Sequence, residues 1–385
     1  MYILFLCDFY SHFFMHYGFL IIFYFSVINM DISNIIIVFI LTFVATIIAT
    51  YFVRGILRNA DVSDSPIVSE HRHKAGTPTM GGLAFLFALT FIVAVYFRNT
   101  SILIVSFIML TAGLMGFIDD LLGLKVKEYQ KVVKNISDSA VPLGLLNLGP
   151  GEEARVSTEK AKEQVGKLID EGKVELITEI PIKYEPSEGS KIVVQLLPGL
   201  FLALTGVVTT CAGFTLGLFV FPVAIIALLG SINAVNLIDG MDGLAAGIVG
   251  IASFACCIYG FISGDLTKMV PFAILVGICL GFLVFNKHPA SIFMGDTGSF
   301  VLGAGYAAAV LVCDIPFFGV LALAVPIAST VISLMHRAHI INLPVEPLHH
   351  TLNYHGMSEK KIVYSYWLLT VVACAIGLIA KYYFF

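Results

Sequence analysis

Two asparagines and two aspartates recur at three-residue intervals in the stretch NAVNLIDGMDGLAAG, residues 233–247. They lie between long apolar runs and are Asn233, Asn236, Asp239 and Asp242. On a helix, each three-residue step turns about 60° backwards, so Asn236, Asp239 and Asp242 would fan over roughly a third of the circumference. We therefore expect these three side chains to converge on one ligand. The alternative, a capping Asn and Asp at a helix end, accounts for one or two of them.

Two further stretches place carboxylates at the borders of apolar runs. Asp119 and Asp120 directly follow one run, and Asp296 lies in a glycine-flanked turn ten residues after Asn286. Two solvated acids and an ordinary N-cap would be the purely structural explanation. Acids at the C-terminal end of a helix oppose its dipole, which favours a functional role for the pair. Because magnesium shares its coordination shell with substrate phosphates, these acids and amides predict a site for Mg²⁺ and a diphosphate.

Two basic stretches would face the phosphates. The first, HRHKAGTPTMGG, precedes an expected helix and contains His71, His73, Lys74, Thr77 and Thr79. The free N–H groups at a helix N-terminus favour anions. The second, EPLHHTLNYHG, contains His349, His350 and His355. The alternative is that these histidines are ordinary residues of the membrane interface.

The composition assigns the chain to the membrane. Its mean hydropathy is +0.93 and only 12% of its residues are charged, whereas about a quarter are charged in soluble domains. Apolar runs of roughly 17 to 25 residues can cross a bilayer as helices. We place ten of them, at 34–53, 80–97, 101–118, 192–210, 214–232, 243–263, 269–285, 299–314, 316–335 and 362–384. The sequence therefore predicts an all-α polytopic membrane protein.

Charge and cysteine usage exclude other classes. A formal net charge of -4 argues against nucleic-acid binding, which needs clustered Lys and Arg. The seven cysteines lie mostly inside apolar runs without CxxC spacing, which indicates small core residues rather than disulfides or zinc ligands. Residues 1–29 form a further apolar stretch, which is either an eleventh helix or a mis-assigned start before Met30.

Counting the crossings puts nearly every polar cluster on one face. The loops after the first, third, fifth, seventh and ninth expected helices hold the acids, amides and histidines described above, while the opposite loops are short. The same loops carry most of the Lys and Arg residues. By the positive-inside rule this face is cytoplasmic, so we expect a cell-membrane protein whose site faces the cytoplasm.

One segment interrupts the membrane pattern. Residues 135–191 are rich in charge and separate two blocks of helices, at 30–134 and 192–385. Within the segment, Ser157 would cap a short amphipathic helix that stops at Gly172, and KVELITEI alternates like a strand. We expect a small soluble α/β insertion with a docking or regulatory role.

Five stretches together carry a family resemblance: HKAGTPTMGG, GFIDD, NLIDGMDGLAAG, NKHPASIFMGDTGS and PLHH. In this order, on alternate loops of ten helices, they resemble the polyprenyl-phosphate N-acetylhexosamine-1-phosphate transferases, with motifs nearest to the phospho-N-acetylmuramoyl-pentapeptide transferase branch. The resemblance covers residues 34–134 and 192–384. It implies transfer of a sugar-1-phosphate from a UDP-N-acetylhexosamine to a polyprenyl phosphate in the bilayer, with release of UMP. It also implies Mg²⁺ as cofactor, with Mn²⁺ as a substitute.

The resemblance gives the acids specific roles. Asp119 and Asp120 match the family's acidic pair, and the first of them is preferred as the base on the lipid phosphate. Asp296 matches the magnesium ligand, with the acidic pair as further candidates for the metal. The other matches are the nucleotide and metal loop with Asn236, Asp239 and Asp242, the uridine-side Asn286, the positions Lys74 and Thr79 before the second helix, and His349 and His350 of a three-histidine signature.

Two departures leave the substrate open. Thr351 stands where the muramoyl branch has a third histidine, and the 135–191 insertion is not part of the family pattern. Both a peptide-bearing MurNAc and a GlcNAc donor therefore remain candidates, and the resemblance also admits a homodimer. The same residues would serve either a single displacement or a covalent phospho-sugar enzyme. Alternatives from other classes are a cation-coupled transporter and a non-catalytic membrane scaffold.

Overall fold

The computed structural model describes residues 31–63, 76–124, 126–143, 146–156, 159–183 and 188–384. These residues form two compact units. The first comprises the described parts of Met1–Asp120 and Glu188–Phe385, and the second comprises those of Leu121–Ser187. The apolar extension predicted at residues 1–29 lies outside the described residues.

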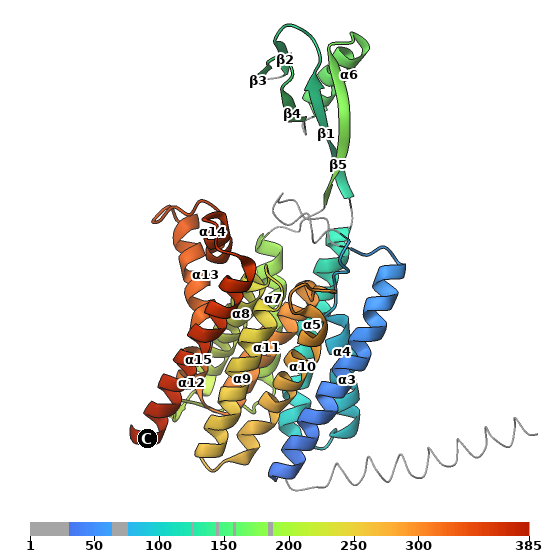
Figure 1. Ribbon diagram of the computed structural model, residues 1–385. Coiled ribbons are helices and arrows are strands. Elements are labelled where there is room, and N and C mark those ends of the chain that lie inside the picture. Colours follow the sequence, from blue (N-terminus) through green and yellow to red (C-terminus); the bar gives the residue numbers. More distant parts are fainter. Residues whose placement is uncertain are drawn as a thin grey trace, which may run out of the picture. The chain divides into compact units, whose positions relative to one another are not determined.

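The first unit is a bundle of helices, which confirms the predicted all-α membrane class (Figure 1). Its helices are α3 (Ile32–Asn59), α4 (Leu83–Val95), α5 (Thr100–Leu124), α7 (Glu188–Leu204), α8 (Val220–Ile238), α9 (Leu244–Ile262), α10 (Val270–Asn286), α11 (Gly295–Val312), α12 (Pro316–Ala322), α13 (Ala324–Arg337), α14 (Leu348–Tyr354) and α15 (Glu359–Phe384). Two 3₁₀ turns, Gly217–Phe219 and Leu266–Met269, precede α8 and α10. In the described part of the chain, seven helices are long and apolar enough to span a membrane, and the bent pair α12–α13 would be an eighth.

Each of the ten predicted spans contains a helix, but one span is broken. The helix expected at 316–335 bends by 72° between α12 and α13. Pro326 accounts for the break, because in a continuous helix its ring would clash with the carbonyl of Ala322 four residues earlier. In the first turn of a new helix the missing N–H of proline is tolerated. α4 and α7 are shorter than the spans predicted for them.

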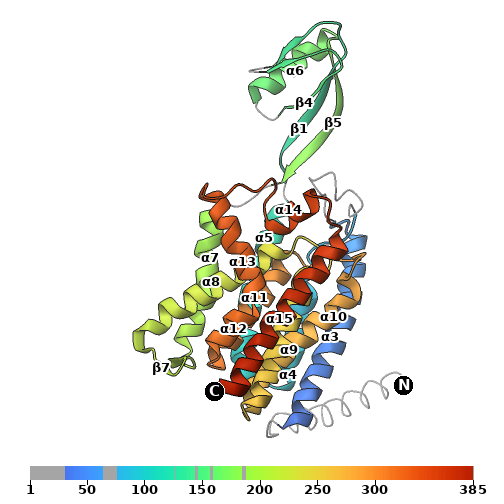
Figure 2. The ribbon, with the colours of Figure 1, turned by 60° about the vertical axis from the view of Figure 1, so that its left-hand side comes forward.

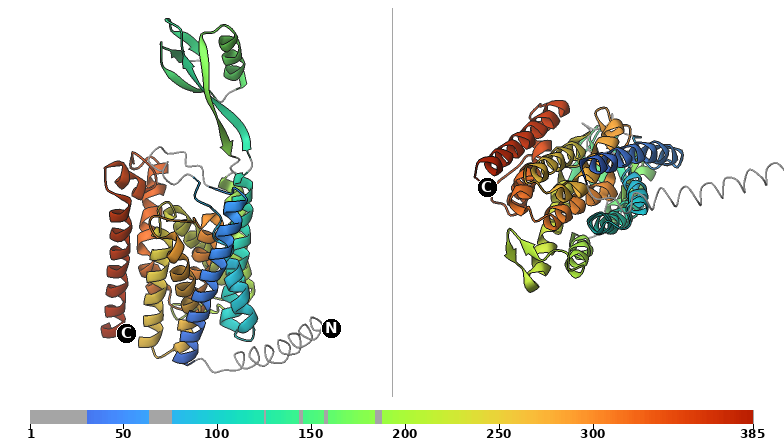
Figure 3. Two further views of the ribbon diagram at one scale, coloured as in Figure 1. Left: turned by 45° about the vertical axis from the view of Figure 1, so that its right-hand side comes forward. Right: turned by 90° about the horizontal axis from the view of Figure 1, so that it is seen from below.

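The centre of the bundle is α11, of which 83% is buried (Figures 2 and 3). Apolar side chains gain little by leaving lipid for another helix, so membrane helices associate through small residues that allow close packing. Gly82, just before α4, is an example. A Cβ atom there would lie 2.1 Å from the backbone nitrogen of Gly298 in the first turn of α11.

The second unit is a small antiparallel sheet with one helix, which agrees with the expected α/β insertion. Its sheet has the strand order β4-β1-β5, formed by β4 (Glu153–Val156), β1 (Val126–Asn135) and β5 (Val174–Lys183). A hairpin of β2 (Val141–Leu143) and β3 (Leu146–Leu148) and the helix α6 (Glu159–Asp170) complete the unit. Its buried residues are Val133, Val141, Leu143, Leu148, Val156, Val165, Leu168 and Val174. The predicted cap Ser157 lies outside the described residues.

Replacing Gly82 with alanine tests the close approach to α11. We expect Gly82→Ala to lower the thermal unfolding temperature of the detergent-purified protein, at a cost of about 1–3 kcal/mol, because the added Cβ meets backbone that cannot move aside. Circular dichroism during heating measures the change. Gly55→Ala in α3 is the matched control, since no atom lies within 4 Å of the added Cβ there. Equal unfolding temperatures for the two variants would contradict the packing argument.

Candidate active site

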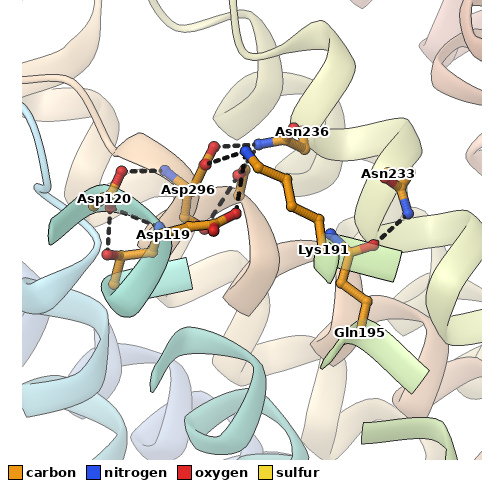
Figure 4. Close-up of polar contacts among 9 residues, drawn as sticks. Asp119, Asp120, Lys191, Gln195, Asn233, Asn236 and Asp296 are labelled. Carbon is orange, nitrogen blue, oxygen red and sulfur yellow. Dashed lines mark hydrogen bonds and ion pairs between the residues drawn. The ribbon is translucent and has the colours of Figure 1, made fainter. Parts of the chain in front are cut away.

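The first turn of α11 carries Asp296 and is held by a carboxylate from another helix (Figure 4). Asp120, near the end of α5, accepts hydrogen bonds from the backbone N–H groups of Asp296 and Thr297, each at 2.9 Å. The Thr297 hydroxyl donates to the same carboxylate. A helix N-terminus has unpaired N–H groups and a partial positive charge. Asp120 therefore caps α11 from a different helix and fixes the place of Asp296.

Gly116, one turn before Asp120, allows α5 to approach α11 closely. A Cβ at Gly116 would lie 2.3 Å from the carbonyl oxygen of Asp296. Only glycine allows the two backbones to come this close. The stretch GFIDD can place its two acids beside α11 because its glycine, Gly116, has no side chain to collide with the first turn of that helix.

Lys191 joins two of the acids. Its Nζ lies 3.2 Å from Oδ2 of Asp119 and 3.7 Å from Oδ2 of Asp296. Asn236 completes the group, since its Nδ2 donates to Oδ1 of Asp296 at 2.7 Å and to Oγ of Ser299 at 2.9 Å. The acids predicted from α5 and α11 thus meet at one ammonium group, with an amide that orients Asp296 (Figure 4).

Sequence reasoning missed Lys191, because it was counted as the last residue of the charged insertion. The available signal was its position directly before an apolar run on the polar-loop face. One turn further along α7, Gln195 is 3% exposed and its Oε1 accepts a hydrogen bond from Nδ2 of Asn233 at 2.7 Å. Asn233 therefore links α8 to α7 beside the acidic group.

Asn236, Asp239 and Asp242 do not lie on one helix, so the predicted helical fan of these three side chains was wrong. α8 ends at Ile238, Asp239 is its C-terminal cap, and α9 begins only at Leu244. Gly243, the residue directly before α9, adopts φ +75°, a left-handed conformation that glycine accepts readily, so Asp242 lies in the turn between the two helices. The side chain of Asp242 consequently reaches different partners from that of Asn236.

Asp242 belongs to a second cluster. Its Oδ2 accepts a hydrogen bond from the backbone N–H of Ala290 at 3.0 Å and lies 3.1 Å from Nδ1 of His288. Asn286 lies beside it, with its Oδ1 accepting from the N–H of Gly243 at 3.1 Å and its Nδ2 donating to the carbonyl of Ile292 at 3.0 Å. The predicted substrate-side Asn286 is thus already used to join two loops.

The paired histidines lie against the loop between the two clusters. A Cβ at Gly240 would meet Nε2 of His349 at 2.6 Å and Nε2 of His350 at 2.9 Å. His349 is fully buried, and the two ring centroids are 4.4 Å apart. Thr351, at the position of the third histidine, donates its hydroxyl hydrogen to the carbonyl of Val345.

Backbone hydrogen bonds hold the segment before α4, residues 78–82, beside the start of α11. The carbonyl of Pro78 accepts from the N–H of Phe293 at 2.8 Å, and the N–H of Gly82 donates to the carbonyl of Met294 at 2.9 Å. Thr79 lies between Pro78 and Gly82 in the chain, and its backbone N–H donates to the carbonyl of Val62 at 3.4 Å. Lys74, predicted to bind substrate, lies outside the described residues, as do His71 and His73.

The chain matches models of one family of known transferases. Residues 184–314 match the glycosyl transferase family 4 model, and residues 74–86 match signature 1 of the phospho-N-acetylmuramoyl-pentapeptide-transferases. A relative from Alkaliphilus metalliredigens named phospho-N-acetylmuramoyl-pentapeptide-transferase is 31% identical over 365 residues, covering 91% of this chain and 98% of the relative. The chain belongs to glycosyl transferase family 4.

Other relatives of this glycosyl transferase also match over most of their length. One from Methanothermobacter thermautotrophicus, whose assignment as a phospho-N-acetylmuramoyl-pentapeptide-transferase is itself provisional, is 57% identical over 343 residues and covers 89% of this chain and 97% of its own. A transferase of the same name from Pelotomaculum thermopropionicum is 33% identical over 329 residues, with 83% of this chain and 88% of the relative covered. The resemblance inferred from the motifs is confirmed.

The cap on α11 can be tested in this glycosyl transferase by removing its charge. Asp120→Asn is expected to lower the free energy of unfolding by about 2 kcal/mol, because a charged acceptor for two backbone N–H groups is lost and an amide group takes its place. Thr297→Val removes only the hydroxyl donor and should cost about 1 kcal/mol. Denaturant unfolding followed by circular dichroism measures both. If Asp120→Asn proved the milder of the two, the cap would not be the main role of this carboxylate.

Proposed function

We propose that this glycosyl transferase moves an N-acetylhexosamine-1-phosphate from a UDP-sugar to a polyprenyl phosphate. The oxygen of the lipid phosphate attacks the phosphorus that carries the sugar. The bond between that phosphorus and the bridging oxygen breaks, and UMP leaves. One observation supports the proposal most directly: the side chains of Asp119, Asp296, Lys191 and Asn236 meet in one group. The relatives that match this chain over most of their length also bear the name of a phospho-sugar transferase.

The charges of this group suit a diphosphate. Phosphoryl transfer needs positioning and neutralisation of charge more than covalent chemistry from the protein. The ammonium of Lys191 offsets the repulsion between Asp119 and Asp296 and offers positive charge to phosphate oxygens. In the single-displacement mechanism, Asp119 accepts the proton of the lipid phosphate. In the covalent alternative, an aspartate oxygen attacks first and the lipid phosphate then takes the sugar-phosphate from it.

The donor set also fits a magnesium ion. Mg²⁺ is commonly held by one or two carboxylates together with substrate phosphates. Asp296 would hold it, with Asp119 as a second ligand, because both direct Oδ2 towards the same cationic group, Lys191. Asp120 is a poorer candidate, since its carboxylate already accepts two backbone N–H groups and a hydroxyl. When bound, the ion would neutralise the diphosphate and stabilise the departing UMP.

The placement of the acids favours this function over a cation-coupled transporter. Asp119 lies near the end of α5 and Asp296 in the first turn of α11, so both belong to helix termini on the polar-loop face. Transporter acids more commonly lie near the middle of the bilayer. Lys and Arg are concentrated in the same loops, and we therefore propose that this face is cytoplasmic, where UDP-sugars are made available to it.

A transfer assay with the purified protein tests the proposal. Continuous release of UMP over many turnovers is expected only when a UDP-N-acetylhexosamine, a polyprenyl phosphate and Mg²⁺ are all present, and EDTA should abolish it. A panel containing UDP-GlcNAc and UDP-MurNAc-pentapeptide identifies the sugar. Asp296→Asn should lower the rate by about a thousandfold, as expected when an electrostatic contact at the reacting group is lost. Ion-coupled uptake by vesicles without UMP release from any UDP-sugar would establish the transporter instead.

Lys191 offers a second test. Lys191→Met should lower kcat by about a hundredfold, because the two carboxylates and the incoming phosphates lose a shared positive charge. The same variant should need less Mg²⁺ for half its maximal rate, since the ion would meet two carboxylates without a competing ammonium. Lys268→Met is the matched control, since Lys268 pairs with Asp265 at 3.8 Å in an opposite loop. An unchanged kcat for Lys191→Met would remove this residue from the site.

A further inference from the structure

Two carboxylates and one imidazole from three separate segments meet in the second cluster, around Asp242. They are Asp242 in the loop before α9, His288 in the loop after α10 and Glu359 in the first turn of α15. Nδ1 of His288 lies 3.1 Å from Oδ2 of Asp242 and 3.9 Å from Oε2 of Glu359. Among the described residues, this set alone brings three potential metal-ligating side chains within 4.8 Å of one another.

Hydrogen bonds tie this trio to the backbone of both loops. Oε1 of Glu359 accepts from the backbone N–H of Asp242 at 2.7 Å, so α15 holds the main chain at this position. Oδ2 of Asp242 accepts from the N–H of Ala290 at 3.0 Å, so the same residue holds the loop after α10. Asp242 is therefore fixed at both its backbone and its carboxylate.

The burial of the Asp242 carboxylate points to a role beyond stability. Asp242 is 4% exposed, and a buried carboxylate is commonly neutral or costly for stability compared with an apolar side chain of the same volume. The two loops are already joined by the Asn286 amide, which makes two neutral hydrogen bonds between them. What Asp242, His288 and Glu359 add is a fixed position for a carboxylate beside that amide.

We propose that His288 and Glu359 are positioning residues that hold Asp242 in place for the nucleoside half of the substrate. This inference rests on the proposed function and deepens it. A carboxylate held in one place suits a planar base with an N–H group on its edge. The acidic group around Asp296 handles the phosphates, so the trio acts on binding of the nucleotide and not on the transfer step.

The binding of UMP to the detergent-purified protein, measured by calorimetry without Mg²⁺, tests this inference apart from catalysis. His288→Ala should weaken UMP binding about tenfold, because the close contact that holds the Asp242 carboxylate is lost. His288→Gln keeps a donor for Asp242 and should restore most of the affinity. Glu359→Gln keeps the acceptor for the Asp242 N–H and should bind UMP nearly as wild type, whereas Glu359→Ala should resemble His288→Ala.

The transfer assay supplies a second readout. His288→Ala should raise KM for the UDP-sugar about tenfold while kcat, KM for the polyprenyl phosphate and the Mg²⁺ requirement stay within twofold of wild type. His339→Asn is the control, because this exposed histidine has φ +57°, a conformation that asparagine tolerates. A changed Mg²⁺ requirement would overturn the inference and make the trio a metal site, and unchanged UMP affinity in both alanine variants would also overturn it.

The two readouts separate failure of the inference from failure of the proposed function. If the wild-type protein binds UMP but transfers nothing, the proposed reaction is wrong, and the effect of His288→Ala on UMP binding still decides the role of the trio. If the wild-type protein does not bind UMP, both are overturned. Asp296→Asn serves as the reciprocal control, because it should lower the transfer rate by about a thousandfold and leave UMP binding without Mg²⁺ unchanged.

Discussion

The arrangement of the site depends on one hydrogen-bonded contact, between the carboxylate of Asp120 and the first turn of α11. The start of a helix leaves backbone N–H groups without partners, and Thr297 is fully buried, so water cannot take their place there. Asp120 satisfies two of these groups and complements the helix dipole. Because α11 is the most buried of the candidate spans, the position of Asp296 follows from this contact.

The polar residues around this contact divide into two groups with different chemistry. In one group Lys191 lies between Asp119 and Asp296, an arrangement suited to phosphates and a metal ion. In the other, neighbours from α15 and from the loop after α10 hold Asp242 in place. This arrangement suits recognition of an uncharged base. The short stretch from Asn236 to Asp242 connects the groups, and the paired histidines pack on it at Gly240.

Much of this could be predicted from the sequence alone. Ten apolar runs predicted ten helical segments, because the bilayer dictates both their length and their composition. The acids, amides and histidines were expected on one face because loop parity follows from counting crossings. Less accessible were residues whose role depends on a distant partner. Lys191 carried only the weak signal of a charge at a helix border, and His288 and Glu359 became notable only when Asp242 was placed between them.

The sequence by itself determined the membrane class, the family motifs and the face on which the polar loops gather, since these depend on local composition and order along the chain. Tertiary structure alone decided which polar residues share a cluster. The three-residue spacing from Asn236 to Asp242 suggested one helical face, but α8 ends at Ile238, so the backbone leaves the helix before Asp242 and the two side chains reach different partners. Hydrogen bonds and ion pairs act over about 3 Å, so residues that are far apart in the sequence become partners only when the fold brings them together.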